Sequence, residues 1–300
     1  MPPVPVHEDA LVHEFLAASP ARQAQILSAW GLPPASALIL VNACESRCFF
    51  CAGPGTIAVP AADITPRQRI LDFFGQASPE QGRLIIAGNE PLLHPDVDLA
   101  FELAAAAGFA PIQLMTSALS LEPARLRRFV AQGLRELVVP IYSAEASLHD
   151  EISGRPAFQQ LVEGLDLAHA LGLRLHLHTL ALRRTLAGLP ALARLCEQRW
   201  GARLAVAPLR DKALFRFADE ALPLDELRLA LAALPVSRLG LPLCVGRALP
   251  QSEALAIEVY FRTQRRGYAA ACEGCADRPA CPGVVEAALC AWGERGLEPR

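Results

Sequence analysis

Short apolar segments recur along the first two thirds of this 300-residue chain, and each is followed by a turn and a stretch of helical periodicity. Brief apolar runs between turn signals are typical of buried strands, and strands that alternate with helices form parallel sheets. We predict strands at 37–43, 84–87, 112–116, 136–142, 173–180 and 203–208. The sequence therefore predicts an α/β fold.

Helix signals occupy the intervals between these strands. Proline in a first helical turn and glycine after a last turn mark helix ends, because proline lacks an N–H and glycine tolerates a positive φ. We predict helices that begin at Thr65-Pro66, run from 96 to 107, follow Pro123 and run from 157 to 171. Apolar residues at helical spacing around Ser19-Pro20 predict one more helix before the first strand.

Six strand–helix units can close partly into a barrel of the (β/α)6 TIM type or open into a doubly wound sheet. In a barrel, the loops at the carboxyl ends of the strands build the functional site. Polar or metal-binding segments follow the first four predicted strands, at 44–51, 88–91, 116–117 and 142–143. We therefore predict the partial barrel, with its site on this rim.

The alternation of strands and helices stops near residue 210. We divide the chain into an N-terminal helical extension at 1–36, a core barrel at 37–210 and a small cysteine-rich subdomain at 211–300. Within the last part, the pattern predicts a helix at 223–234 and a short strand at 254–261.

Composition narrows the classes of partner. Hydrophobic residues make up 52% of the chain and charged residues 20%, which excludes a disordered protein. A formal net charge of −3 gives no reason to expect nucleic acid or an anionic membrane as a partner. Charge or proline interrupts each apolar stretch before about 18 residues, and the first ten residues lack a signal-peptide pattern. We predict a cytoplasmic protein.

Six of the nine cysteines form two clusters, with C-x3-C-x2-C at 44–51 and C-x2-C-x5-C at 272–281. An odd, clustered set in a reducing compartment favours metal binding or catalysis over a disulfide framework. A structural zinc ion takes four ligands, so zinc at the first cluster would need His94 or another residue. A [4Fe–4S] cluster held by three thiolates instead keeps one iron open to an external ligand.

The segment CESRCFFC at 44–51 resembles the C-x3-C-x-Φ-C signature of the radical S-adenosylmethionine (SAM) enzymes. GNEPLLHPD at 88–96 is similar to the GGEP segment of that family. TSA at 116–118 lies where a TNG segment often follows the third strand, and 141–165 resembles the fourth strand and its helix. The resemblance extends over about 37–208.

The resemblance implies a [4Fe–4S] cluster held by Cys44, Cys48 and Cys51, with SAM on the open iron. An electron from a donor such as flavodoxin or ferredoxin would cleave SAM to a 5′-deoxyadenosyl radical, which abstracts hydrogen from a substrate. Glycine would let the backbone approach SAM, and a carboxylate would accept from its ammonium group. The residues implied to bind SAM are Phe50, Gly88, Asn89, Glu90, Thr116, Ser143 and Arg155.

Two positions depart from the family pattern, Asn89 in place of a glycine and Ser117-Ala118 in place of Asn-Gly. For Thr116 and Ser143, capping of a strand end is an alternative role. His176 and His178 alternate on one strand face, where they would line a substrate pocket or pack in the core with hydrogen-bond partners.

The second cluster resembles part of the SPASM/twitch regions of radical SAM enzymes. Four thiolates, from Cys244, Cys272, Cys275 and Cys281, would fully ligate one auxiliary [4Fe–4S] cluster that transfers electrons. A four-cysteine zinc site is the alternative. If Cys244 is not a ligand, Cys290 or the substrate would complete the cluster.

The resemblance implies an enzyme that modifies a peptide or protein, as in the maturation of ribosomally made peptides. About 36 residues precede the first strand, too few for the winged-helix leader-binding domain of many peptide maturases. A separate recognition protein or a small-molecule substrate therefore stays open. A small-molecule dehydrogenase or biosynthetic enzyme of the same family is the alternative, and a non-catalytic zinc or iron–sulfur binding module is a remote one.

Overall fold

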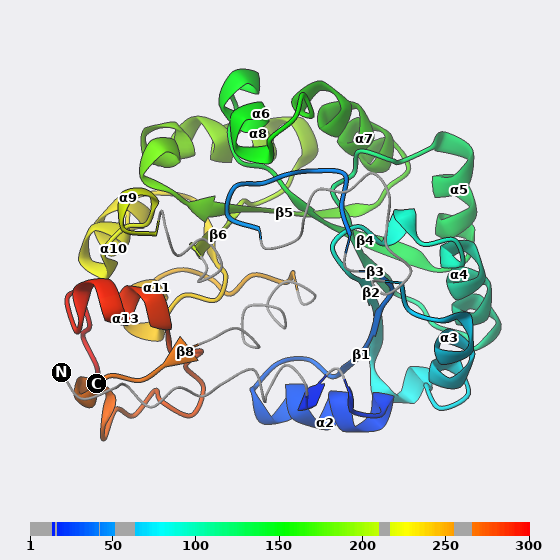
Figure 1. Cartoon of the computed structure of the whole chain (residues 1–300), viewed down its shortest axis with the longest axis horizontal. Coiled ribbons are helices and arrows are strands. Elements are labelled where there is room, and N and C mark those ends of the chain that lie inside the picture. The colour runs from blue at the N-terminus through cyan, green and yellow to red at the C-terminus, as the bar shows by residue number, and fades with distance from the viewer. Residues whose placement is uncertain (1–13, 16, 42, 52–63, 210–216, 255–265) are drawn as a thin grey trace.

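The computed structural model describes residues 14–15, 17–41, 43–51, 64–209, 217–254 and 266–300 (Figure 1). Its centre is a parallel sheet of seven strands that lie side by side in chain order. They are β1 Ala35–Ile39, β2 Arg83–Ala87, β3 Ile112–Met115, β4 Leu134–Pro140, β5 Arg174–Ala181, β6 Ala205–Pro208 and β7 Ser237–Arg238. The predicted α/β fold is confirmed, and Figure 1 shows the sheet curving into an arc that is not closed.

The seventh strand is a finding that the sequence pattern did not predict. It has two residues, Ser237 and Arg238, which pair in register with Ala205 and Val206 of β6. A segment of two residues has no hydrophobic periodicity, so only its pairing with β6 identifies it as a strand. The sheet therefore continues past residue 210.

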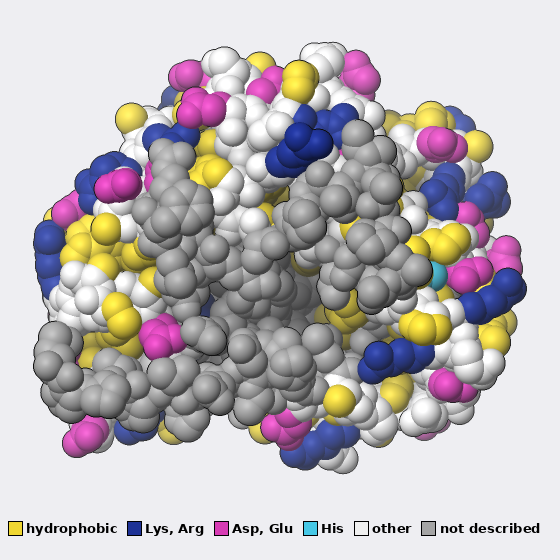
Figure 2. Space-filling view, in the orientation of Figure 1, with side chains coloured by type: hydrophobic (Ala, Val, Ile, Leu, Met, Phe, Trp, Pro, Cys, Tyr) yellow, Lys and Arg dark blue, Asp and Glu magenta, His cyan; other side chains and the backbone are white. Residues whose placement is uncertain are grey.

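Helices cover the outer side of the arc (Figure 1). None of the helices within the described ranges is both long and apolar enough to cross a bilayer. The α-helices are α2 Pro20–Ala29, α3 Arg67–Phe74, α4 Val97–Ala106, α5 Pro123–Ala131, α6 Ala146–Ser153, α7 Phe158–Ala170, α8 Leu189–Trp200, α9 Phe217–Glu220, α10 Leu224–Leu231, α11 Leu243–Gly246 and α13 Glu286–Trp292. Short 3-10 helices lie at η2 Pro79–Gln81, η3 Pro91–Leu93, η4 Arg183–Gly188 and η6 Ala270–Cys272. On the face shown in Figure 2, basic and acidic side chains are interspersed around the rim.

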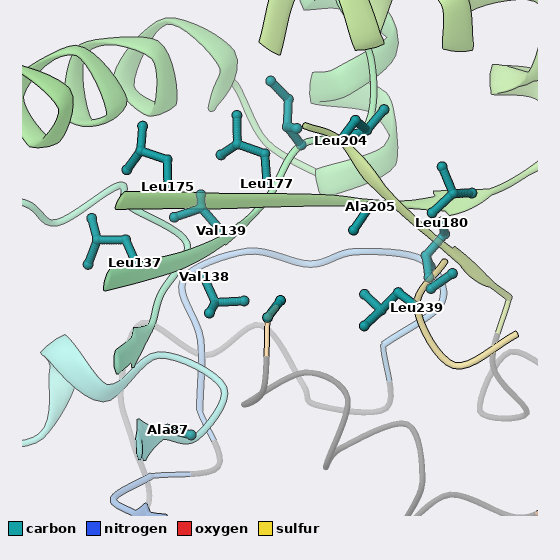
Figure 3. Packing of buried hydrophobic residues seen from close by; sticks show 14 of the residues in the cluster. Ala87, Leu137, Val138, Val139, Leu175, Leu177, Leu180, Leu204, Ala205 and Leu239 are labelled. Atoms are coloured by element: carbon teal, nitrogen blue, oxygen red, sulfur yellow. The ribbon is translucent and has the colours of Figure 1, made fainter. Parts of the chain in front are cut away.

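The core lies between the sheet and these helices. Figure 3 shows Leu175 and Leu177 of β5 on the helix side of the sheet, whereas Val138 of β4 points to the inner side. The two leucines are 7% and 0% exposed. Side chains alternate between the two faces of a strand, so residues two positions apart, such as these two leucines, lie on the same face.

The inner face of the sheet holds a buried polar network at the amino ends of its strands. One carboxylate oxygen of Glu136 accepts from Arg83 at 2.9 Å, from Gln113 at 2.7 Å and from His176 at 3.2 Å. Burial by itself would raise the pKa of Glu136, but the hydrogen bonds from His176 and Gln113 and the Arg83 charge lower it to about 2. The network joins four neighbouring strands, β2 to β5, through one anion.

The C-terminal region is attached through a second, antiparallel pair of strands, β8 Arg266–Gly267 and β9 Val284–Val285. The buried Arg266 guanidinium donates to the carbonyls of Pro282, Gly283 and Gly240 at 2.7–3.3 Å. It thereby joins this pair to the loop after β7. The strand predicted at 254–261 lies outside the described residues except for Ala254, and the start of the predicted N-terminal helical stretch does so as well.

The loop with the first three cysteines is held against the end of α6. The Arg47 N–H donates to the Ser153 carbonyl at 2.8 Å, and the Phe49 N–H to Ile152 at 3.4 Å. Gly154 follows with φ +71°, and a Cβ at this position would lie 2.6 Å from the Arg47 carbonyl oxygen. Only glycine lets the two segments approach this closely.

We predict that Gly154→Ala destabilises the protein more than Gly172→Ala. Both glycines have a positive φ, +71° and +74°, so both substitutions incur the left-handed penalty of about 1–2 kcal/mol. Gly172 has nothing within 4 Å of an added Cβ, and only Gly154 clashes with the cysteine loop. Urea-denaturation midpoints measured without oxygen will show the difference, and equal losses for the two variants would contradict the packing described above.

We also predict that Glu136 gives the protein an acid-dependent stability. Its pKa is lower in the folded state, about 2, than the ordinary 4.5, so its contribution is complete above about pH 4.5. It is lost as the pH falls from there toward 2, and amounts to about 3 kcal/mol over the whole range. Glu136→Gln is therefore less stable at pH 7 and shows a weaker decline of the urea midpoint between pH 5 and pH 3. An exposed control, Glu80→Gln, keeps the decline of the parent, and a parent-like decline in Glu136→Gln would refute the prediction.

Candidate cofactor-binding site

The first three cysteines lie just after β1, at the carboxyl edge of the sheet. Cys44, Cys48 and Cys51 are each partly buried. The Cys51 N–H donates to the Cys48 carbonyl at 2.9 Å, and the Ser46 N–H reaches the Cys44 sulfur at 3.4 Å. The Cys48 sulfur lies 3.7 Å from the Tyr142 hydroxyl oxygen. The structure thus brings the three thiols onto one compact loop.

Both ring nitrogens of His94, the alternative fourth ligand for zinc, already form hydrogen bonds. His94 is 1% exposed, and its Nδ1 accepts from the Asp96 N–H at 2.9 Å. Nε2 therefore carries the proton and donates to the Thr65 carbonyl at 2.9 Å. Within the described ranges, no three His, Cys, Asp or Glu side chains form a group that could hold a single metal ion.

An aromatic row packs beside the cysteine loop. Phe50 is buried, with its ring edge-to-face against Phe49 and Tyr142 at 5.3 Å between centroids. Tyr142 in turn stacks on His149 at 5.3 Å. Burial lowers the pKa of His149 to about 4, so its neutral ring accepts from the Tyr142 N–H at 3.3 Å. The row joins the loop to the end of β4.

Gly88, Asn89 and Glu90 follow β2 and lie against the chain that leads into Cys44. The Asn89 N–H donates to the Val41 carbonyl at 2.9 Å, and the Glu90 N–H to Ala43 at 3.0 Å. Gly88 has φ +140°, and a Cβ there would lie 2.3 Å from the Val41 carbonyl oxygen. Position 88 therefore requires glycine, because a side chain would clash with the backbone that precedes the cysteines.

Glu90 is fully buried and collects donors from two loops. It accepts from the Leu92 N–H at 3.1 Å and from the Thr116 hydroxyl at 2.9 Å. The Ser117 N–H and hydroxyl donate at 2.7 and 2.5 Å. Burial raises the pKa of Glu90, while the Ser117 bonds lower it and the nearby charge of Glu45 raises it further. The Thr116 hydroxyl is thus a hydrogen-bond donor to Glu90, which is a role beyond the capping of a strand end.

Glu45 is a site residue that the sequence reasoning missed. Its carboxylate accepts from the Ser117 hydroxyl at 3.3 Å and from the Ser120 hydroxyl at 3.1 and 3.2 Å. Ser117 has a single hydroxyl proton, yet both Glu45 and Glu90 compete for it. No spacing in the sequence links position 45 to positions 117 and 120. Only the shared carboxyl edge of the parallel sheet brings them together.

Together with burial, these carboxylates raise the pKa of the first cysteine. Burial raises the pKa of Cys44 to about 12, and the charges of Glu90, Cys48 and Glu45 add to the shift. Negative charge on this sulfur is therefore costly unless a metal stabilises it, because a coordinating thiol is held as the thiolate by the metal.

The remaining predicted SAM ligands lie in the segment after β4. The Ser143 hydroxyl is buried and accepts from the Glu145 N–H at 3.0 Å, which is the turn-capping role left open above. Arg155 reaches the Glu45 carbonyl at 3.5 Å. Both residues follow β4, and Arg155 contacts the cysteine loop.

The two histidines of β5 occupy different levels of the inner face. His176 pairs in register with Val138 and is bound to Glu136, so it belongs to the polar network. His178 pairs with Pro140, nearer to the carboxyl edge and the cysteines, and is 7% exposed. His178 therefore lies closer to the site than His176.

Four cysteines of the C-terminal region lie around one pocket. Cys244, Cys272, Cys275 and Cys281 line one pocket together with Tyr268 and Arg278. Cys290 lies on α13, is exposed and does not line that pocket. Cys196 is fully buried in α8, where burial raises its pKa to about 12, as expected of a core residue.

The chain is similar in sequence to known proteins. The chain is 31% identical over 150 residues to AdoMet-dependent heme synthase from Methanosarcina barkeri, covering 49% of this chain and 42% of that protein. It is 29% identical over 205 residues to GTP 3′,8-cyclase from Nitrobacter hamburgensis, covering 64% and 58%. The matched region therefore spans about half the length of these relatives.

Solved structures share the fold. Native anSMEcpe with bound AdoMet matches with a TM-score of 0.57 at 13% identity, over 89% of this chain and 93% of that chain. SuiB of Streptococcus suis bound to precursor peptide SuiA matches with a TM-score of 0.53 at 15% identity, over 70% and 48%. The family model described as the radical SAM superfamily matches residues 38–196, more than half of the chain. This chain belongs to the radical SAM superfamily.

Proposed function

We propose that Cys44, Cys48 and Cys51 hold a [4Fe–4S] cluster that binds SAM, and that the enzyme abstracts hydrogen from a peptide or protein. The observation that carries this proposal is the bond from the N–H of the fully buried Glu90 to the carbonyl of Ala43, which places this carboxylate next to the start of the cysteine loop. When bound, the cluster and SAM supply a radical reactive enough to take hydrogen from an unactivated carbon. A flavodoxin or ferredoxin is the proposed external electron donor.

The surroundings of Glu90 fit a cofactor that brings an amino group. The donors that reach its carboxylate in the described part of the chain are hydroxyl and backbone N–H groups, all of them neutral. A buried carboxylate is best stabilised by a cationic or strongly polar donor. The amino group of SAM would supply one, with Thr116 and Ser117 holding the carboxylate in place.

The other residues of the site are proposed to keep water out and to hold SAM and the substrate in position. Phe50 and Tyr142 give the cysteine loop an apolar wall, which keeps water away from a radical reaction. Asn89 and Arg155 remain proposed SAM ligands on the resemblance to the family pattern. His178 is the proposed substrate-facing residue of the inner face.

We propose that the second pocket holds an auxiliary [4Fe–4S] cluster on Cys244, Cys272, Cys275 and Cys281. The support is that all four sulfur-bearing residues line one pocket while Cys290 does not. A two-electron oxidation of a substrate needs an acceptor for the second electron, and this cluster would be that acceptor. Zinc bound to the same four thiols would be redox-silent and is the alternative.

The peptide substrate is favoured by the likeness of the fold to SuiB, whose structure contains a precursor peptide. A small-molecule substrate is the second candidate. It is favoured by the curated relatives, one named as a GTP cyclase and the other as a heme synthase.

Anaerobic reconstitution with iron and sulfide tests both cysteine sites. We expect about eight irons per chain if both hold [4Fe–4S] clusters and about four if the second holds zinc. Replacing Cys44, Cys48 and Cys51 together by Ala removes about four irons and all 5′-deoxyadenosine formation from SAM under dithionite. Cys290→Ala is the matched control and keeps both. A triple variant that still forms 5′-deoxyadenosine would disprove the proposed function.

Replacing Glu90 by Gln tests the proposed contact to SAM. The change keeps the shape of the side chain and removes its charge, so SAM binding to the reconstituted protein should weaken by about 1.5–3 kcal/mol. Equilibrium dialysis gives the affinity, and the iron content shows whether the cluster is intact. Glu80→Gln, on the exposed turn η2, should bind SAM like the parent. If Glu90→Gln binds SAM with unchanged affinity and full iron, Glu90 is not a SAM ligand.

A further inference from the structure

The hydroxyl of Tyr142 lies beside one of the three thiols of the first loop. Its oxygen is 3.7 Å from the Cys48 sulfur, and the residue is 7% exposed. A hydrogen bond to sulfur is longer than one to oxygen because the sulfur atom is larger. A free thiol and a hydroxyl can each donate, but a thiolate bound to iron has no proton. With a metal bound to Cys48, the Tyr142 hydroxyl is therefore the donor.

The ring of Tyr142 is held on both sides. It packs edge-to-face on Phe50 and stacks on His149, with 5.3 Å between ring centroids in each pair. Its backbone N–H donates to Nδ1 of His149 at 3.3 Å. These contacts fix the plane of the ring and hence the position of its hydroxyl.

The backbone on the Cys48 side is held as well. The Cys48 carbonyl accepts from the Cys51 N–H at 2.9 Å, within the loop. The next residue, Phe49, donates its N–H to the Ile152 carbonyl of α6 at 3.4 Å. The distance between the hydroxyl and the sulfur is thus set by two separately anchored segments.

Reduction of an iron–sulfur cluster adds one negative charge, which is shared with the ligand sulfurs. A hydrogen bond to a ligand sulfur stabilises the reduced form and raises the reduction potential, and burial among apolar side chains makes such a bond stronger. The Ser46 N–H, at 3.4 Å from the Cys44 sulfur, acts in this direction at the start of the loop. The Tyr142 hydroxyl acts in the same direction at Cys48.

We propose that the Tyr142 hydroxyl donates to the Cys48 thiolate and raises the reduction potential of the first cluster. This inference rests on the proposed function. In the step concerned, the external donor loses one electron and the oxidised cluster gains it, and the hydroxyl keeps its proton. Tyr142 is a positioning residue in this role, because it acts through Cys48. Its hydroxyl makes the cluster easier for the donor to reduce.

The test compares Tyr142→Phe with the parent in the reconstituted enzyme without SAM. Phenylalanine keeps the ring between Phe50 and His149 and removes only the hydroxyl. We expect the midpoint potential of the first cluster, followed by EPR during redox titration, to fall by about 59 mV. This value is a tenfold change for a one-electron couple. The first cluster is recognised as the one whose EPR signal changes when SAM is added to a parallel sample.

The matched control is Tyr268→Phe, which removes a hydroxyl that donates to the Cys281 carbonyl at 2.7 Å in the second pocket. The first cluster of this variant should keep the parent potential. A second replacement of Tyr142, by 3-fluorotyrosine, keeps the hydroxyl and makes it more acidic and hence a stronger donor. It should raise the potential of the first cluster, a shift of opposite sign that a loss of packing would not produce.

The outcomes separate this inference from the proposed function. If Tyr142→Phe keeps the parent potential at full iron content, the inference is wrong and the proposed function stands. If that variant loses its iron, the 3-fluorotyrosine protein decides, and an unchanged potential there overturns the inference. A parent protein with no SAM-sensitive EPR signal would overturn the proposed function, and this inference with it.

Discussion

The site depends on the backbone pairing between the residues that precede Cys44 and the residues that follow β2. The N–H groups of Asn89 and Glu90 bind the carbonyls of Val41 and Ala43, so the cysteine loop cannot move independently of the Glu90 carboxylate. This pairing requires glycine at position 88, because the Val41 carbonyl fills the space of a side chain. One short contact thus sets the distance between the proposed cluster ligands and the proposed ligand of SAM.

The two groups of cysteines have different charged neighbours. Glu45 and Glu90 surround the first group, and Ser117 joins them through one hydroxyl. The pocket of the second group is lined by side chains of both signs, Arg278 and Asp277. The same fold can hold both since the sites are built on separate layers of structure, the main sheet and the β8–β9 pair.

Much of the fold and part of the site could be predicted from the sequence. The six longer strands and the helices after Thr65 and Pro123 were identifiable because apolar runs, prolines and glycines act locally. The clustering of Cys44, Cys48 and Cys51 was readable for the same reason, since a loop of eight residues keeps its thiols together. Glu45, Ser120 and β7 were not predictable. Their partners are far away in sequence, and no local pattern identifies them.

The sequence alone determined the α/β class, the rim on which the site lies and the three thiols of the first loop, because each follows from residues within one short segment. The tertiary structure decided how these pieces act together. It turned Thr116 and Ser117 toward Glu90 and bound His176 into a network with Glu136. These contacts join residues 26 to 40 positions apart along the chain, a separation that the neighbouring parallel strands close.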